Sequence, residues 1–423
     1  MSTTSNNWVQ KFIKAILAIG PGIFAIGYTI GTGSVTSMLV AGSTYGMQLL
    51  WVLLLSCYFS GVLIYVYGNY SLITGETALY AFKKRLKWGK AIGILIILGI
   101  IIGQWNSLIG IVGITSNIFH EIFMIYWPGL SDYQYQSVLI IALVIVGVFY
   151  LLLLQGSYTF FEKILVIFVS IMGLSFLLSL LLVYPLPVDV IKGLIPSIPD
   201  VKEGKMMVAA FVGTTMAGAT FLSRPLFIKG KGWTKEDLGI QRRDAISAAI
   251  LIFLISGAIM AVACGALYYD GQPIKHVSDM PGSLEPIAGK FAMTIFFFGT
   301  LSAGLSSIFP ILLIVPLLIA DYNYGELDTK SKQFKIITAI ASVLALTIPI
   351  FGANPIDGQI LSQVFNVFVL PLVIIGMMVL INSTSFRSIH KTALWINISL
   401  FASLIFSLVI SYNGILGIAS YFS

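Results

Sequence analysis

The chain has 423 residues, of which 58% are hydrophobic and 10% are charged, and its mean hydropathy is +0.97. A soluble domain usually carries about a quarter charged residues, so this composition excludes a water-soluble fold. The net charge of +7 requires no nucleic-acid partner, because basic loops that face anionic lipid account for it.

Apolar runs of about 20 residues recur along the whole chain, and this is the length that crosses a bilayer core as an α-helix. We therefore predict an all-α integral membrane protein with eleven spans, forming a single transporter domain over residues 1–423. The predicted spans cover residues 14–41, 47–70, 90–119, 136–155, 163–184, 206–228, 244–269, 288–320, 335–351, 358–382 and 393–412.

Basic residues gather in the loops that follow the even-numbered spans. These loops hold Lys83, Lys84, Arg85, Lys87, Lys90, Lys229, Lys231, Lys235, Arg242, Arg243, Lys330, Lys332, Lys335, Arg387 and Lys391. The opposite loops hold only Lys192, Lys202, Lys205, Lys275 and Lys290. Because basic loops remain in the cytoplasm, we expect a cytoplasmic N-terminus and an external C-terminus in a bacterial-type inner membrane.

Two spans are interrupted by small and polar residues. The first carries Gly31, Thr32, Gly33 and Ser34, and the sixth carries Ala217, Gly218, Ala219 and Thr220. The interruptions correspond if residues 14–184 and 206–382 are two inverted five-helix repeats, with 393–412 as a peripheral eleventh helix. Broken helices at matching places in inverted repeats predict a substrate site near the bilayer midplane. The alternative is that the small residues only allow close helix packing.

Several motifs resemble those of the Nramp family of proton-coupled divalent-metal transporters, and the resemblance covers nearly the whole chain. They are Gly20-Pro21-Gly22, Ala41-Gly42-Ser43, the small-residue and paired-serine stretch from Ser302 to Ser307, Leu361-Ser362-Gln363-Val364, and Leu370-Pro371. The resemblance implies a leucine-transporter-type fold, with a ten-helix inverted-repeat core and one extra helix.

The chain departs from the family at the residues that handle metal. The family's Asp-Pro-Gly-Asn motif falls on Gly31 to Ser34, and its Met-Pro-His motif falls on Ala217 to Ala219. Its proton-handling acids fall at Gln104 and Ser107, and a second histidine falls at Arg224. The sequence thus resembles a divergent branch that has lost the metal-binding motifs, so the family's metal transport does not carry over to these positions.

The predicted midplane site consists of backbone, hydroxyl and amide groups. All 17 carboxylates fall at or beyond a membrane face, which leaves no anionic ligand for a transition metal and no acid for a proton relay. We expect substrate contacts at the eight interruption residues and at Gln363. The candidate pathway or coupling residues are Arg224, Gln104, Ser107, Ser306 and Ser307.

The helix N-termini at the two breaks favour an anion. We therefore predict an alternating-access carrier of a small inorganic anion, with bicarbonate as first choice. Arg224 either adds positive charge to the cytoplasmic path or, as we favour, extends to the membrane surface. Ser306 and Ser307 could hold a coupling Na⁺ with carbonyls of the first span.

The alternative cargo is Mg²⁺, which we expect to need at least one midplane carboxylate, and an amino acid is a third candidate. An enzyme would need intramembrane His, Asp or Glu, so we expect a transporter without a cofactor, a metal centre or an obligate protein partner. Its partners are the small ion and the bilayer.

Overall fold

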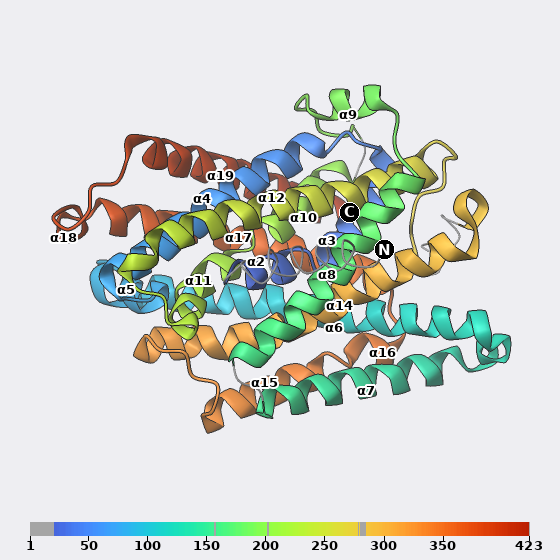
Figure 1. The fold of residues 1–423 in the computed structure, drawn as a ribbon, viewed down its shortest axis with the longest axis horizontal. Coiled ribbons are helices and arrows are strands. Elements are labelled where there is room, and N and C mark those ends of the chain that lie inside the picture. Colours follow the sequence, from blue (N-terminus) through green and yellow to red (C-terminus); the bar gives the residue numbers. More distant parts are fainter. Residues whose placement is uncertain (1–20, 156–157, 201–202, 278, 280–284, 423) are drawn as a thin grey trace, which may run out of the picture.

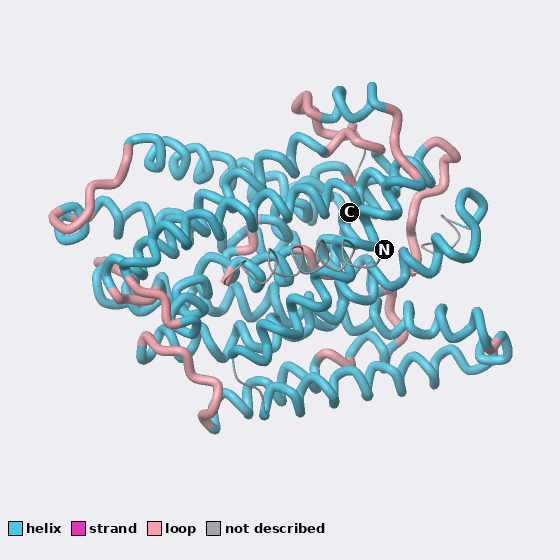
Figure 2. The backbone as a smooth tube through the Cα atoms, in the orientation of Figure 1, coloured by secondary structure: helices cyan, strands magenta, loops and turns pink. Residues whose placement is uncertain are grey.

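A computed structural model describes residues 21–155, 158–200, 203–277, 279 and 285–422. Over these residues the chain is a bundle of helices with loops gathered mostly at its two ends (Figures 1 and 2). Ten helices are long and apolar enough to cross a membrane, and a bent pair at the start makes up to eleven. The prediction of a multi-pass, all-α membrane protein is therefore confirmed.

The first half of the bundle contains five spans joined by short helices. The spans are α2 (Gly22–Thr29) with α3 (Thr32–Tyr45), α4 (Leu50–Thr74), α6 (Gly89–Tyr126), α7 (Gln134–Gln155) and α8 (Tyr158–Leu182). The connecting helices are α5 (Ala78–Arg85), η1 (Pro128–Tyr133) and α9 (Pro187–Gly193). The predicted stretch 14–20 of the first span lies outside the described residues.

The second half contains six spans. They are α10 (Gly204–Thr215) with α11 (Gly218–Lys231), α12 (Leu238–Ala263) with the π-helical turn η3 (Cys264–Tyr268), α14 (Glu285–Tyr324), α15 (Lys332–Leu344) with α16 (Thr347–Phe351), α17 (Pro355–Asn382) and α19 (Leu394–Phe422). The short helices η2 (Lys235–Asp237) and α18 (Thr384–Arg387) lie between spans.

The last helix is longer than predicted, because it continues past residue 412 to Phe422. Its second half contains glycines that allow close packing on α10. A Cβ atom at Gly417 would lie 2.8 Å from the backbone of Met206. Small residues that pack against a neighbouring helix weaken the hydropathy signal without ending the helix. The helix end predicted from the sequence therefore came before the actual end.

The broken spans occupy the interior of the bundle. Every residue of α2 is buried, as is every residue of α10 except Lys205, and α11 is buried from Gly218 to Ile228. Around them, α6 packs against α17 and α14, α12 packs against α3 and α4, and α10 contacts α17 and α19. Figure 1 accordingly shows α2, α3, α10 and α11 surrounded by the longer helices.

The basic loops meet at one end of the bundle. Helix α5, the turn at η2, the start of α15 and α18 lie at the left of Figure 1, whereas α9, α16 and the α6–α7 connection lie at the other end. The sequence pattern therefore identifies two chemically different ends. Which end faces the cytoplasm stays a prediction.

Candidate functional site

Both predicted helix breaks are present. Helices α2 and α3 are bent by 49°, and Gly31 precedes α3 in an extended conformation. Likewise, α10 ends at Thr215, and Ala217 precedes α11 with extended backbone. Neither α3 nor α11 has a side-chain cap at its start.

Hydroxyl groups from neighbouring helices bind the carbonyl ends of the two broken spans. Ser307 donates to Gly27 O at 3.0 Å, and Thr214 donates to Thr29 O at 3.3 Å. Ser60 donates to Thr215 O at 2.7 Å. These bonds satisfy carbonyls that a helix terminus leaves without an intrahelical partner, and Thr214 joins the two breaks directly.

A small pocket lies where the breaks meet α6, α14 and α17. Its accessible volume is about 10 Å³, which is close to the space that one water molecule needs. It is lined by Tyr28, Gly31, Gly33, Ser34, Gln104, Ser107, Ile111, Thr214, Ala217, Ser307, Ile311, Gln363 and Asn366. The pocket thus brings together Gly31, Gly33 and Ser34 of the first interruption, Ala217 of the second, and Gln363. It also contains three candidate pathway residues, Gln104, Ser107 and Ser307.

Amide side chains of α6 and α17 form a continuous hydrogen-bonded network beside the pocket. Gln104 Nε2 donates to Asn366 Oδ1 at 2.8 Å, and Asn366 Nδ2 donates to Gln363 Oε1 at 3.1 Å. Gln363 and Gln359 both donate to Ser107 Oγ, at 3.2 Å and 3.0 Å. All five side chains are buried, so each amide is held in a fixed orientation by its neighbour.

Glycines allow the backbone of the first break to approach these polar groups. A Cβ atom at Gly33 would collide with the amide nitrogens of Gln359 and Gln363. A Cβ atom at Gly31 would collide with the hydroxyl of Ser307. The absence of side chains at both positions therefore determines the shape of the pocket.

Several predicted residues lie elsewhere. Gly218 faces Val373, whose Cγ2 would lie 3.2 Å from an added Cβ, and neither Ala219 nor Thr220 lines the pocket. Ser306 donates to Ala303 O within its own helix at 2.9 Å, so it does not join Ser307 at the first break. The side chain of Thr32 is outside the described residues.

Four polar contributors were not predicted, namely Tyr28, Thr214, Asn366 and Gln359. The positions of Gln359 and Asn366 could have been found from Gln363, because residues four before and three after it share its helix face. Thr214 lay inside the polar stretch of the sixth span, but one turn before the predicted contacts.

Arg224 does not extend to the membrane surface as we expected, since only 1% of it is exposed. Its guanidinium forms an ion pair with Asp244 of α12 and a hydrogen bond with Gln241. Asp244 Oδ2 also accepts a bond from Gly22 N, at the start of α2, at 2.9 Å. Asp244 is itself buried. A buried cation requires such a counter-ion, and this partner could not be assigned from the sequence.

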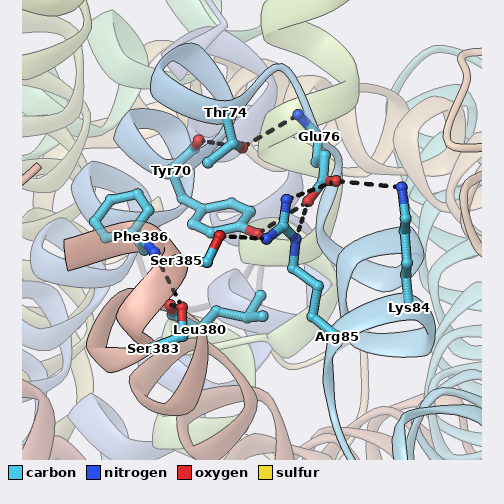
Figure 3. Close-up of polar contacts among 9 residues, drawn as sticks. All are labelled: Tyr70, Thr74, Glu76, Lys84, Arg85, Leu380, Ser383, Ser385 and Phe386. Carbon is cyan, nitrogen blue, oxygen red and sulfur yellow. Dashed lines mark hydrogen bonds and ion pairs between the residues drawn. The ribbon is translucent and has the colours of Figure 1, made fainter. Parts of the chain in front are cut away.

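A second charged cluster closes the turn between α4 and α5 (Figure 3). Glu76 accepts two bonds from Arg85, at 2.6 Å and 3.0 Å, and one from Tyr70 at 3.2 Å. Arg85 also donates to Ser385 of α18 at 3.0 Å. Burial alone would raise the pKa of Glu76, but the bonds and charge of Arg85 outweigh burial and hold this pKa below its ordinary value.

Solved structures share this architecture. A manganese transporter mutant from Eremococcus coleocola aligns with a TM-score of 0.69 at 14% identity, over 97% of this chain and 88% of that one. MhsT in complex with L-phenylalanine aligns with a TM-score of 0.64 at 17% identity, over 95% and 98% of the two chains. Mhp1, a nucleobase-cation-symport-1 family transporter, gives 0.59 at 13%, over 95% and 90%. The chain has the leucine-transporter-type fold.

Curated relatives are described as divalent metal cation transporter MntH. The protein of Vibrio campbellii is 25% identical over 413 residues, covering 96% of this chain and 93% of its own. That of Ralstonia nicotianae is 26% identical, with 90% and 85% covered. These relatives move metal cations, which contradicts the prediction of bicarbonate or another small anion as cargo. That prediction relied on the helix N-termini at the two breaks. Arg224, which could have added positive charge to the cytoplasmic path, is paired with Asp244.

The family comparison covers almost the whole chain. The family described as natural resistance-associated macrophage protein-like matches residues 22–417. This range includes both breaks, the amide network and most of the final helix. The chain therefore belongs to the Nramp family.

Proposed function

We propose that this chain is a secondary transporter of a divalent cation, with Mg²⁺ as its cargo, located in a bacterial inner membrane. The pocket between the broken helices is its substrate site, and alternating access exposes that site to each side in turn. The proposal joins the substrate class of the curated relatives to the ligands that this chain offers at the breaks.

The neutral oxygen groups of the pocket are the observation that carries the proposal. Gln104, Gln363 and Asn366 offer amide oxygens, and Ser107 and Ser307 offer hydroxyls. Such hard oxygen ligands suit Mg²⁺, whereas softer metals prefer thiolate, thioether or imidazole. Among the described residues, no group of three or more His, Cys, Asp or Glu could hold a metal ion.

The pocket lining contains no carboxylate, although we expected from the sequence that Mg²⁺ would need one. We now give up that requirement, because Mg²⁺ keeps several of its waters when it binds. Amide oxygens and hydroxyls would then contact the water shell as well as the ion. The pairing of Arg224 with Asp244 also supports a cation, since it offsets the positive charge that Arg224 places on α11.

Uptake into proteoliposomes tests the proposal. Wild-type protein with a magnesium-sensitive dye inside the vesicles should show saturable Mg²⁺ uptake. Gln104→Leu should abolish most of it, because the substitution removes a ligand and leaves Asn366 Oδ1 without its donor. Asn106→Leu is the matched control, since Asn106 lies on the same helix but is exposed, and its amide donates to Ile102 O of that helix.

Equal uptake by the Gln104→Leu and Asn106→Leu variants would show that the pocket is not part of the transport path. Uptake of Mn²⁺ without Mg²⁺ would keep the cation class but overturn the choice of cargo. No uptake of either ion by the wild type would overturn the proposal.

A further inference from the structure

An apolar groove runs along the outer face of α12, away from the transport pocket. Two adjoining cavities of about 380 Å³ and 580 Å³ share Phe253 and Leu254. The first lies between α4, α12 and the start of α19, and the second continues toward α9. Together they follow α12 from Arg242 to Ala261, which corresponds to most of a spanning helix.

Small residues create the groove. A Cβ atom at Gly61 of α4 would lie 2.9 Å from Cβ of Ala249 on α12, so the two backbones approach closely there. Larger neighbours, including Leu54, Ile246 and Leu254, form the walls. The result is a concave apolar surface within the spanning segments, which lipid chains contact directly in a membrane.

One end of the groove has the features of a lipid headgroup site. Arg242 lines this end and is exposed, and its guanidinium has no hydrogen bond or ion pair with the part of the chain that the structure describes. Tyr65 and Trp395, also in the lining, stack with ring centroids 6.2 Å apart. Tyrosine and tryptophan concentrate at the boundary between lipid and water, where a phospholipid phosphate resides.

We propose that this groove is a binding site for an anionic phospholipid. One acyl chain lies between α4 and α12, and the anionic headgroup pairs with Arg242. The unpaired arginine favours an anionic over a zwitterionic lipid, because a zwitterionic headgroup carries its own cation. This site is independent of the cargo proposed above.

Thermal unfolding of the purified full chain in neutral detergent tests the site, with phosphatidylglycerol and phosphatidylcholine of identical acyl chains as probes. Phosphatidylglycerol should raise the Tm of the wild type more than phosphatidylcholine does. Arg242→Gln should remove this difference by weakening phosphatidylglycerol binding about fivefold, the contribution of one arginine at an anionic lipid surface. Arg242→Lys should retain much of the difference.

Arg243→Gln is the matched control, because Arg243 is the exposed neighbour of Arg242 and lies outside the groove lining. It should behave as the wild type. Equal effects of the two lipids on the wild type would overturn the proposal. The proposal would also be overturned if the Arg242→Gln variant kept the preference for phosphatidylglycerol. The same holds if Arg243→Gln abolished this preference as fully as Arg242→Gln does. Ala249→Leu should reduce stabilisation without changing charge, as expected if a chain occupies the groove.

Discussion

At the scale of single residues, the pocket depends on neutral side chains at places where the Nramp resemblance implies acids. Gln104 occupies one of those places, and its amide donates to Asn366 at 2.8 Å. A glutamate has nearly the same shape, so Gln104→Glu changes the charge of the site with little change in packing.

Gln104→Glu should increase the apparent affinity for Mg²⁺ by about tenfold or more, because opposite charges attract strongly in a site of low dielectric. The gain should disappear as the pH falls, since protonation neutralises the new carboxylate. Dye-based uptake at several pH values measures both effects. An unchanged affinity at every pH would place Gln104 outside the ion's path.

Gly33→Ala should slow uptake by roughly tenfold, equivalent to about 1.4 kcal/mol, because the new methyl group would displace the amides of Gln359 and Gln363. Gly257→Ala provides the comparison, since its Cβ would meet only Leu53 Cδ2 at 3.8 Å. Elution from a size-exclusion column verifies folding. Full activity of the Gly33 variant would show that this contact is not required.

At the scale of elements, the Arg224–Asp244 pair joins α11, α12 and the start of α2. Arg224→Met should destabilise the protein by about 3–5 kcal/mol, because it leaves the Asp244 carboxylate buried without its counter-ion. Adding Asp244→Asn should recover a large part of that loss, since the neutral amide can still accept the bond from Gly22. Denaturant unfolding of both variants measures the recovery, and a double variant less stable than the single one would contradict this account.

Acid should weaken the connection between α4, α5 and α18. The folded-state pKa of Glu76 is lowered, whereas an unfolded glutamate titrates near 4.3. The stability that Glu76 contributes is therefore fully present above the unfolded pKa and is lost as the pH falls through the lower folded pKa. The Tm difference between wild type and Glu76→Gln should be largest near neutral pH and shrink below about pH 4. A Tm difference that does not change with pH would show that the Glu76–Arg85 ion pair is not its cause.

At the scale of the whole molecule, apolar runs were enough to predict the spanning bundle, and the small and polar residues inside two of them predicted the broken helices. Hydropathy reports the length of a lipid-facing helix, and small polar interruptions inside it stand out. Boundaries were less predictable where helices pack closely on protein, as at the end of α19 beside α10.

The partners of buried polar residues could not be read from the sequence. Asp244 lies 20 positions from Arg224, and Gln104 lies 262 positions from Asn366. The tertiary fold brings Arg224 of α11 to Asp244 of α12, and the packing of α6 on α17 brings Gln104 to Asn366. Consequently, Asp244, an acid assigned to the membrane face, proved to be the buried counter-ion of Arg224.

The neutrality of the pocket lining has a consequence for the energetics of the transport cycle. No Asp, Glu, His, Lys or Arg lines it among the described residues, and the nearby ion pair carries no net charge. The empty carrier would therefore return without moving charge through the membrane field, whereas the loaded carrier would move two charges. Each charge that crosses the full field gains about 2.3 kcal/mol per 100 mV. The voltage across vesicles can be clamped with valinomycin. Voltage should then accelerate the movement of the loaded carrier and leave the return of the empty carrier unaffected. At strongly negative potentials, the return of the empty carrier should therefore limit the rate of the cycle.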